Sequence, residues 1–498
     1  MKHATLSRIL AALLALIMMI SMLCMVSCAD DTADPDDGEQ TPDDSTTPSD
    51  GDGTDDPAEV EDDTPDVHEL PAELDFGGYE FRICTRERNF FHSNWITDDF
   101  DGGGINDAIF QRQNQVAEEL GVTFVEELVQ QTEPARVAVM AGSDDYDMIN
   151  ARCSDAWSYA EQDLVVPISE LPYIDLEQSY WDDNLNAAMS IGGVMYFATG
   201  ASNITAYDFT HALLFNKQMV ADYQLDMPYA LVEAGTWTIE EFATMAEDVT
   251  MEVEGSDDEN IYGYLSQPKA VLPGFWIGSG MLSIEKNAED LPEFVLPENT
   301  AFVDLFDLMY EITYDSGVWY ENKSRENEDP TLLDMFQSDR GLFYSTSFFY
   351  IEKLRGMVTD FGILPYPKYD EKQEEYYSRI EGCEMSCVPI TTVDKERTSA
   401  VLEALASSSA QTVEPAYYDI TLKKQAARDN DSSEMLDIIF QNRVFDLGDT
   451  VWCDVLRDGV FESMFMNEDR ALASKLESVT NVLNGKIEAS IEAFQSKN

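Results

Sequence analysis

Histidine, the side chain that most often transfers protons in enzymes, occurs only at His3, His68, His92 and His211 among 498 residues. No two histidines have the His-x-x-x-His spacing with which a helix holds zinc, so the usual helical zinc-hydrolase signature is absent. A Ser–His–Asp hydrolase would have only His92 or His211 as its base. The histidines therefore disfavour enzyme chemistry.

Polar side chains follow the ends of two predicted strands. Arg86 comes after the first strand, and Arg152, Ser154 and Asp155 come after another. In open parallel sheets ligands bind just beyond the carboxyl ends of the strands, where planar polar groups fix the geometry of hydroxyl groups. We expect these four residues to contact a ligand. The alternative for the two arginines is a surface ion pair.

The cysteines do not predict a disulfide scaffold or a metal site. Of the seven, Cys24 and Cys28 lie near the N-terminus, and the other five are an odd number, so at least one thiol is free. Cys383 and Cys387 have the spacing of half a metal site, but no His or second Cys pair stands near them. We expect buried thiols, with no metal and no cofactor.

The elements that must position the polar groups begin as an α/β unit. Alternating residues at Tyr79–Cys84 predict a strand, and Asn106 is the expected N-cap of a helix that Gly121 ends. Strands are predicted again at 122–125 and 146–150. A strand, a helix and a strand at this spacing predict a right-handed parallel crossover and a doubly wound sheet.

Further along the chain, Thr238 and Glu241 form a capping box, with Trp237 and Phe242 placed for a hydrophobic staple. The last third is predicted to be mainly helical, with a helix from about Glu468 to the end.

Length and charge limit the function classes. A chain of 498 residues is too long for one hydrophobic core, so two lobes are expected. The 97 acidic and 30 basic residues give a net charge of -67, which repels nucleic acid and anionic lipid. We expect no nucleic-acid partner.

The N-terminus predicts export. Lys2 and Arg8 precede an apolar stretch from Ile9 to Val26, and no basic residue follows it closely, so a secretory signal is favoured over a membrane span. Val26-Ser27-Cys28 resembles the bacterial lipobox, which predicts lipidation of Cys28. Residues 29–69 contain 18 acidic residues, no Lys or Arg and no aromatic residue, as expected of an extended tether.

Several ordered motifs resemble the extracellular solute-binding proteins of the carbohydrate-type family 1, which serve ABC importers. They are Asn106–Arg112, Leu171–Leu176 with Tyr180-Trp181, Gly192–Phe197, Leu214–Lys217, Phe361–Asp370, Pro415–Asp419 and Arg443–Gly448. Together with the lipobox and the acidic tether, they are typical of Gram-positive bacteria.

The resemblance implies an α/β, two-lobed periplasmic-binding-protein-like fold (type II), with a hinge between the lobes and a helical C-terminal part. The expected division is residues 1–27 as signal, 28–69 as lipid-anchored tether, 70–203 and 381–445 as lobe 1, and 204–380 with the C-terminal helices of 446–498 as lobe 2.

The resemblance also implies ligand-binding residues in the cleft. Thr199, Ser202 and Asn203 lie where the family crosses between its lobes, and Phe348 and Tyr350 lie where relatives present a stacking aromatic. Trp276 and Trp452 are further stacking candidates. Packing in the core is the alternative for each aromatic ring.

The function implied is capture of a small solute, a sugar or oligosaccharide, and its delivery to an ABC permease, by a monomer lipid-anchored at the extracellular face of the membrane. A glycosidase with two facing carboxylates and a surface sensor or adhesion module are the alternatives. Relatives often carry a calcium loop, but residues 252–260 lack its alternating ligand spacing, so an acidic solvated turn is favoured there.

Overall fold

A computed structural model describes residues 66–87, 95–98, 100, 104–255, 259–321, 330–418 and 429–495. The predicted signal, Cys28, His92 and the tether up to residue 65 lie outside the described residues, as does part of the acidic turn at 252–260. Residues 63–498 belong to one compact unit. Within the described ranges, no helix is both long and apolar enough to cross a membrane.

The first sheet has the strand order β2-β1-β3-β13-β4. It contains β1 (Tyr79–Arg86), β2 (Val122–Val129), β3 (Met148–Arg152), β4 (Phe197–Ala198) and β13 (Glu384–Cys387). Strand β1 is parallel to both β2 and β3, whereas β13 is antiparallel to β3 and to β4. The predicted parallel start of the sheet is confirmed.

The first crossover helix, α2 (Ile105–Leu120), ends at Gly121, whose φ of 61° is the left-handed conformation expected of a C-cap. The predicted N-cap, Asn106, is wrong. The cap is two residues earlier, at Gly104, which has a φ of 84° and supplies no side-chain cap, so the helix begins at Ile105. A conformation that favours glycine, and not a capping side chain, sets this boundary.

Helices cover both faces of the first sheet because successive strand residues point to opposite sides. Ile83 packs with α2 and with α14 (Lys395–Gln411). Cys84 packs with α3 (Glu133–Met140) and α4 (Cys153–Glu161). We call this sheet and its helices the first lobe.

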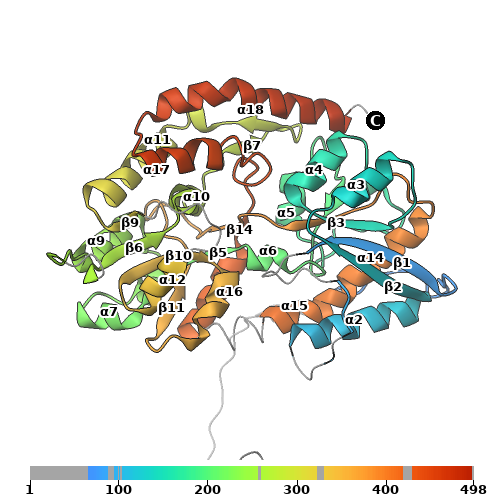
Figure 1. Cartoon of the computed structure of the whole chain (residues 1–498), viewed down its shortest axis with the longest axis horizontal. Coiled ribbons are helices and arrows are strands. Elements are labelled where there is room, and N and C mark those ends of the chain that lie inside the picture. Colours follow the sequence, from blue (N-terminus) through green and yellow to red (C-terminus); the bar gives the residue numbers. More distant parts are fainter. Residues whose placement is uncertain are drawn as a thin grey trace, which may run out of the picture. The chain divides into compact units, whose positions relative to one another are not determined.

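The second sheet has the order β11-β5-β10-β6-β9 and forms the second lobe (Figure 1). Its strands are β5 (His211–Asn216), β6 (Tyr262–Ser266), β9 (Trp319–Glu321), β10 (Gly341–Ser347) and β11 (Phe361–Leu364). Strand β5 is antiparallel to β10 and β11, and β6 is parallel to β10 and β9.

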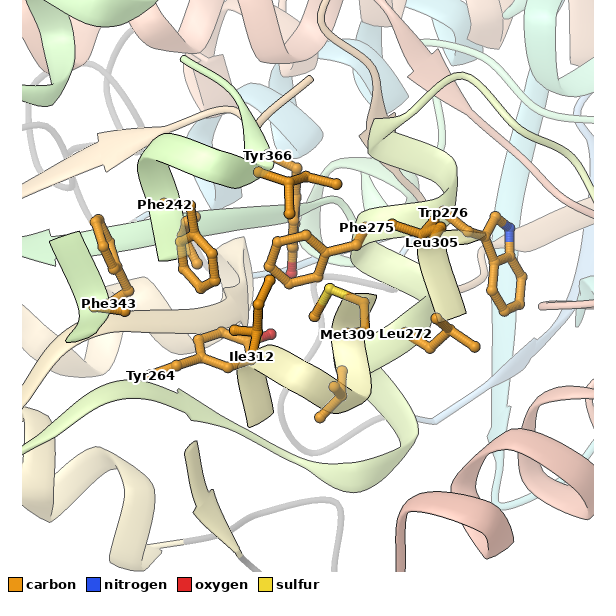
Figure 2. Packing of buried hydrophobic residues seen from close by; sticks show 14 of the residues in the cluster. Phe242, Tyr264, Leu272, Phe275, Trp276, Leu305, Met309, Ile312, Phe343 and Tyr366 are labelled. Carbon is orange, nitrogen blue, oxygen red and sulfur yellow. The ribbon is translucent and has the colours of Figure 1, made fainter. Parts of the chain in front are cut away.

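One face of the second sheet holds an aromatic core with α9 (Ile239–Val249), α10 (Pro268–Gly278) and α11 (Thr300–Tyr310). Figure 2 shows Phe242 of α9 lying among the rings that α10 and the sheet contribute. Its centroid is 5.3 Å from that of Tyr264, at an interplanar angle of 89°. Edge-to-face contacts of this kind add to the burial of the rings.

The predicted Thr238 cap and the hydrophobic staple at the start of α9 are confirmed. The backbone N–H of Glu241 donates to Thr238 Oγ1 at 3.4 Å. The rings of Trp237 and Phe242 lie 6.4 Å apart, as a hydrophobic staple requires.

The opposite face of the second sheet packs against α12 (Pro330–Gln337) and α16 (Asn430–Gln441). Residues 381–445, which were all expected in lobe 1, therefore supply α14 to the first lobe and α16 to the second.

The last helix, α18 (Leu472–Gln495), spans both lobes. Leu472 and Leu476 belong to the aromatic core of the second lobe, whereas Ile487 and Phe494 belong to a core of the first. Figure 1 shows the helix in red, running from beside α17 (Ser463–Asn467) towards α4. It begins after the expected Glu468, because that residue has a φ of 52° and ends α17.

The four last residues of the predicted tether, 66–69, lie against the first lobe. The His68 N–H donates to Ser407 Oγ at 3.1 Å, and His68 Nε2 lies 3.2 Å from Glu119 Oε1. The Asp66 N–H donates to Ser179 Oγ at 3.4 Å. The fold therefore starts before residue 70, the expected boundary.

Candidate functional site

A cavity of about 430 Å³ lies between the two sheets. The first lobe contributes the residues at the ends of its central strands, Arg86 of β1 and Arg152 of β3, and the turn before β13. The second lobe contributes the start of β5 and the end of β10. The lining residues are Arg86, Arg152, Phe209, His211, Gln267, Lys269, Ala270, Leu332, Tyr344, Ser345, Thr346, Ser347, Tyr350, Glu381, Gly382, Cys383, Arg457, Asp458 and Glu462.

Glu381 is the central carboxylate of the cavity wall. His211 Nε2 lies 3.0 Å from Glu381 Oε2, and Lys269 Nζ lies 2.9 Å from Glu381 Oε1. Burial by itself would raise the pKa of Glu381, but Lys269, His211 and the nearby arginines hold that pKa well below its usual range. Glu381 is therefore an ionised hydrogen-bond acceptor and not a proton donor.

Two arginines next to this carboxylate share Asp449. Arg379 pairs with Asp449, and neither side chain is exposed. Arg457 donates to the Asp449 backbone oxygen at 2.8 Å and to Asp458 Oδ1 at 2.6 Å. Burial, together with the charge of Arg379, lowers the pKa of His211, so this imidazole is neutral near pH 7.

Two cysteines face each other at the edge of the cavity. Cys153 follows β3 and Cys383 precedes β13, and the Cys153 N–H donates to the Cys383 oxygen at 2.9 Å. A hydrogen bond from Cys383, with the charge of Arg152, lowers the pKa of the Cys153 thiol to about 7 despite its burial.

The five described cysteines are free and buried, as expected. Cys383 precedes β13 and Cys387 is its last residue, so the two cysteines do not lie on a helix. In the described part of the chain, no three His, Cys, Asp or Glu side chains form a group that could hold a metal ion.

Three residues chosen from the sequence line the cavity: Arg86, Arg152 and Tyr350. Ser154 and Asp155 do not. They lie in the first turn of α4, one turn beyond the strand end where Arg152 stands.

The three polar residues expected at the lobe crossing lie apart from this cavity. Thr199 and Asn203 line a second cavity of about 170 Å³, and Ser202 is buried. Asn203 Nδ2 donates to Asn150 Oδ1 at 3.1 Å and to the Glu384 backbone oxygen at 2.6 Å. Asn203 therefore ties β3 to β13.

The remaining three aromatic candidates lie in the core. Trp276 is fully buried, 5.2 Å from the ring of Phe461, and Figure 2 shows it at one end of the aromatic core. Phe348 packs 4.9 Å from Phe440. Trp452 packs 5.5 Å from Trp157. These three rings therefore pack in the core, which was the alternative to ligand contact for each of them.

Most of the second lobe's contribution to the cavity was not predicted from the sequence. Gln267 follows β6 and Ser347 ends β10. Because ligands bind just beyond the carboxyl ends of strands, both residues could have been predicted once those strands were recognised. Lys269, Glu381 and Arg457 come from a helix, a turn and a π-helical turn that only the tertiary fold brings together.

The sequence matches no family model and no curated protein. Solved structures do resemble the fold. The ABC substrate-binding protein Lmo0181 from Listeria monocytogenes, in complex with cycloalternan, matches with a TM-score of 0.54 at 12% identity, over 82% of this chain and 99% of that one. UspC of M. tuberculosis matches with a TM-score of 0.53 at 13% identity, over 83% and 100%.

A third match is the maltose/maltodextrin-binding domain MalE from Bdellovibrio bacteriovorus, bound to maltotriose. It gives a TM-score of 0.51 at 15% identity, over 81% of this chain and 99% of that one. At these identities the likeness establishes the fold. The predicted α/β, two-lobed binding-protein fold is confirmed.

Proposed function

We propose that this protein is the substrate-binding lipoprotein of an ABC importer, which captures a small saccharide between its lobes and delivers it to a membrane permease. One observation carries the proposal: strand ends of both sheets converge on one cavity of about 430 Å³. This volume falls within the range of small-molecule sites, about 300–1,000 Å³. The structures that share the fold include proteins solved with cycloalternan and maltotriose.

The cavity has the chemistry that saccharides need. Phe209, Tyr344 and Tyr350 supply aromatic surface for C–H faces, and arginine, carboxylate and hydroxyl groups supply hydrogen bonds for sugar hydroxyls. Because the lining comes from two lobes, closure of the lobes would surround the ligand.

The same geometry disfavours a glycosidase. A general acid in such an enzyme needs a raised pKa, whereas Lys269 and His211 hold the pKa of Glu381 well below its usual range. Asp458 is paired with Arg457 at 2.6 Å. We therefore propose binding without turnover.

The proposal includes export and lipidation at Cys28, a Gram-positive source, a position at the extracellular face of the membrane and a monomeric state. The sequence motifs support these features, and the acidic N-terminal segment would keep the binding unit away from the membrane surface.

A thermal-shift screen of the full chain in detergent tests the function, using mono- and disaccharides, peptides and polyamines. Saccharides should raise the melting temperature, and chromatography should recover them unchanged. Stabilisation by peptides or polyamines only would refute the saccharide assignment, and release of sugar fragments would refute binding without turnover.

A further inference from the structure

The cavity has a charge balance opposite to that of the chain. Acidic residues outnumber basic ones by 97 to 30 overall. Among the described residues that line the cavity, the four cations Arg86, Arg152, Lys269 and Arg457 outnumber the three carboxylates Glu381, Asp458 and Glu462. A cationic cavity in so acidic a protein attracts anions to one place.

The carboxylates of the wall neutralise one side of the cavity. Glu381 is 2.9 Å from Lys269 and 3.7 Å from Arg457, and Asp458 is 2.6 Å from Arg457. Glu462 lies one π-helical turn after Arg457. Its carboxylate can accept hydrogen bonds from ligand hydroxyl groups.

Arg152 has no carboxylate partner of this kind among the described residues; only the thiol of Cys153, whose pKa Arg152 helps to lower, balances part of its charge. Within the described residues, the Arg152 guanidinium donates a hydrogen bond to Cys453 Sγ at 3.9 Å and has no carboxylate within ion-pair distance. Asp155 acts on Arg152 electrostatically but neither pairs with it nor lines the cavity. Arg152 also precedes the first turn of α4, whose N-terminal partial charge is positive.

An unpaired guanidinium at the wall of a partly desolvated cavity favours an anionic partner, since the planar fork can bind two oxygens of a carboxylate, sulfate or phosphate. We infer that the ligand is an anionic saccharide whose acidic group pairs with Arg152, an inference that rests on the proposed function. The aromatic and hydroxyl-bearing lining then contacts the rest of the sugar.

Calorimetric titration of the full chain tests this inference with matched probes. The acidic probes are galacturonic acid, digalacturonic acid, glucose 6-sulfate and glucose 6-phosphate, and the neutral probes are galactose, glucose and maltose. At least one acidic probe should bind ten or more times tighter than its neutral counterpart, and this preference should shrink as salt is raised. The probe that gains most identifies the acidic group.

Two substitutions at Arg152 test whether this residue causes the preference for acidic probes. Arg152→Gln should abolish it, and Arg152→Lys should weaken it because an ammonium lacks the planar fork. Arg136→Gln, which removes an exposed arginine paired with Glu133, is the control and should preserve it. If Arg152→Gln does not fold, the Lys variant and the salt dependence show whether Arg152 causes the preference for acidic probes.

The outcomes separate the two proposals. Equal or tighter binding of the neutral sugars, or an acidic preference that survives both substitutions at Arg152, overturns the inference and leaves the proposed function standing. Binding of no saccharide at all overturns both.

Discussion

Arg379 and Asp449 form a bidentate ion pair in which neither side chain is exposed: Nε lies 2.7 Å from Oδ2, and Nη2 lies 3.0 Å from Oδ1. Arg379 ends β12 (Ser378–Arg379), which pairs with β14 (Arg443–Val444), and Asp449 follows β14. The pair therefore joins two segments that are distant in sequence, next to the cavity.

Asp449→Ala should lower the free energy of unfolding by about 3–5 kcal/mol, because it leaves a buried guanidinium without a partner. Urea denaturation measures the loss. The double variant Arg379→Met with Asp449→Leu should lose less, since no charge stays unpaired. Asp315→Ala, which breaks the exposed pair with Arg470, is the control and should barely move the midpoint. An equally small effect of Asp449→Ala would contradict the buried pair.

Trp276 and Tyr350 should respond in opposite ways to removal of the ring. Trp276→Ala should lower the unfolding free energy by about 3–5 kcal/mol and leave the affinity of the folded protein unchanged, because the ring lies in the core. Tyr350→Ala should weaken ligand binding by about tenfold with little loss of stability, because its ring lines the cavity. Calorimetry and urea denaturation separate the effects. Weaker binding without destabilisation in Trp276→Ala would place that ring at the ligand instead.

The buried carboxyl of Asp446 should make the free energy of unfolding rise as the pH falls. Burial and the neighbouring Asp449 raise its pKa from 3.8 to about 6, although Ser283 donates hydrogen bonds to it. Between these values the folded state binds more protons than the unfolded state, so this carboxyl stabilises the fold as the pH falls from 6 to 4. When the pH falls from 7 to 4, the free energy of unfolding of the parent should rise by about 2–3 kcal/mol relative to that of Asp446→Asn, as measured by urea titrations. A difference that stays constant with pH would contradict the assignment.

Cys153 and Cys383 should be cross-linked by mild oxidation. They are directly opposite and hydrogen-bonded, an arrangement with a Cα separation of about 5.5 Å, which a disulfide can span. Diamide would accept two electrons and two protons from the two thiols as the bond forms. Peptide mapping should find this pair linked and Cys84 still alkylatable, and Cys153→Ser should abolish the link. A dominant link between any other pair would refute the geometry.

The local elements were predictable where a strong local signal exists. The left-handed Gly121, the Thr238 cap and the alternating pattern of β1 gave correct elements, and the rule of strand ends found Arg86 and Arg152. The helix start near Asn106 was missed because Gly104, without a capping side chain, sets it.

The rest of the site depends on tertiary structure. Core and cleft rings such as Trp276 and Tyr350 stand in similar apolar runs, and their surroundings differ only after folding. Lys269 and Glu381 are 112 residues apart and meet through the pairing of whole lobes, which no local pattern encodes.

Helix α18 connects the two lobes, because residues near its two ends are anchored in different cores. It is 24 residues long, about 36 Å, and it is held by Leu476 in one core and by Leu483 and Ile487 in the other. The stretch between Leu476 and Leu483 is therefore where the helix crosses from one lobe to the other. For the lobes to close on a ligand, as the proposed function requires, this helix must bend or its anchors must slip. Bending or slippage of α18 would cost part of the binding energy, so substitutions in a helix that does not line the cavity are expected to change affinity.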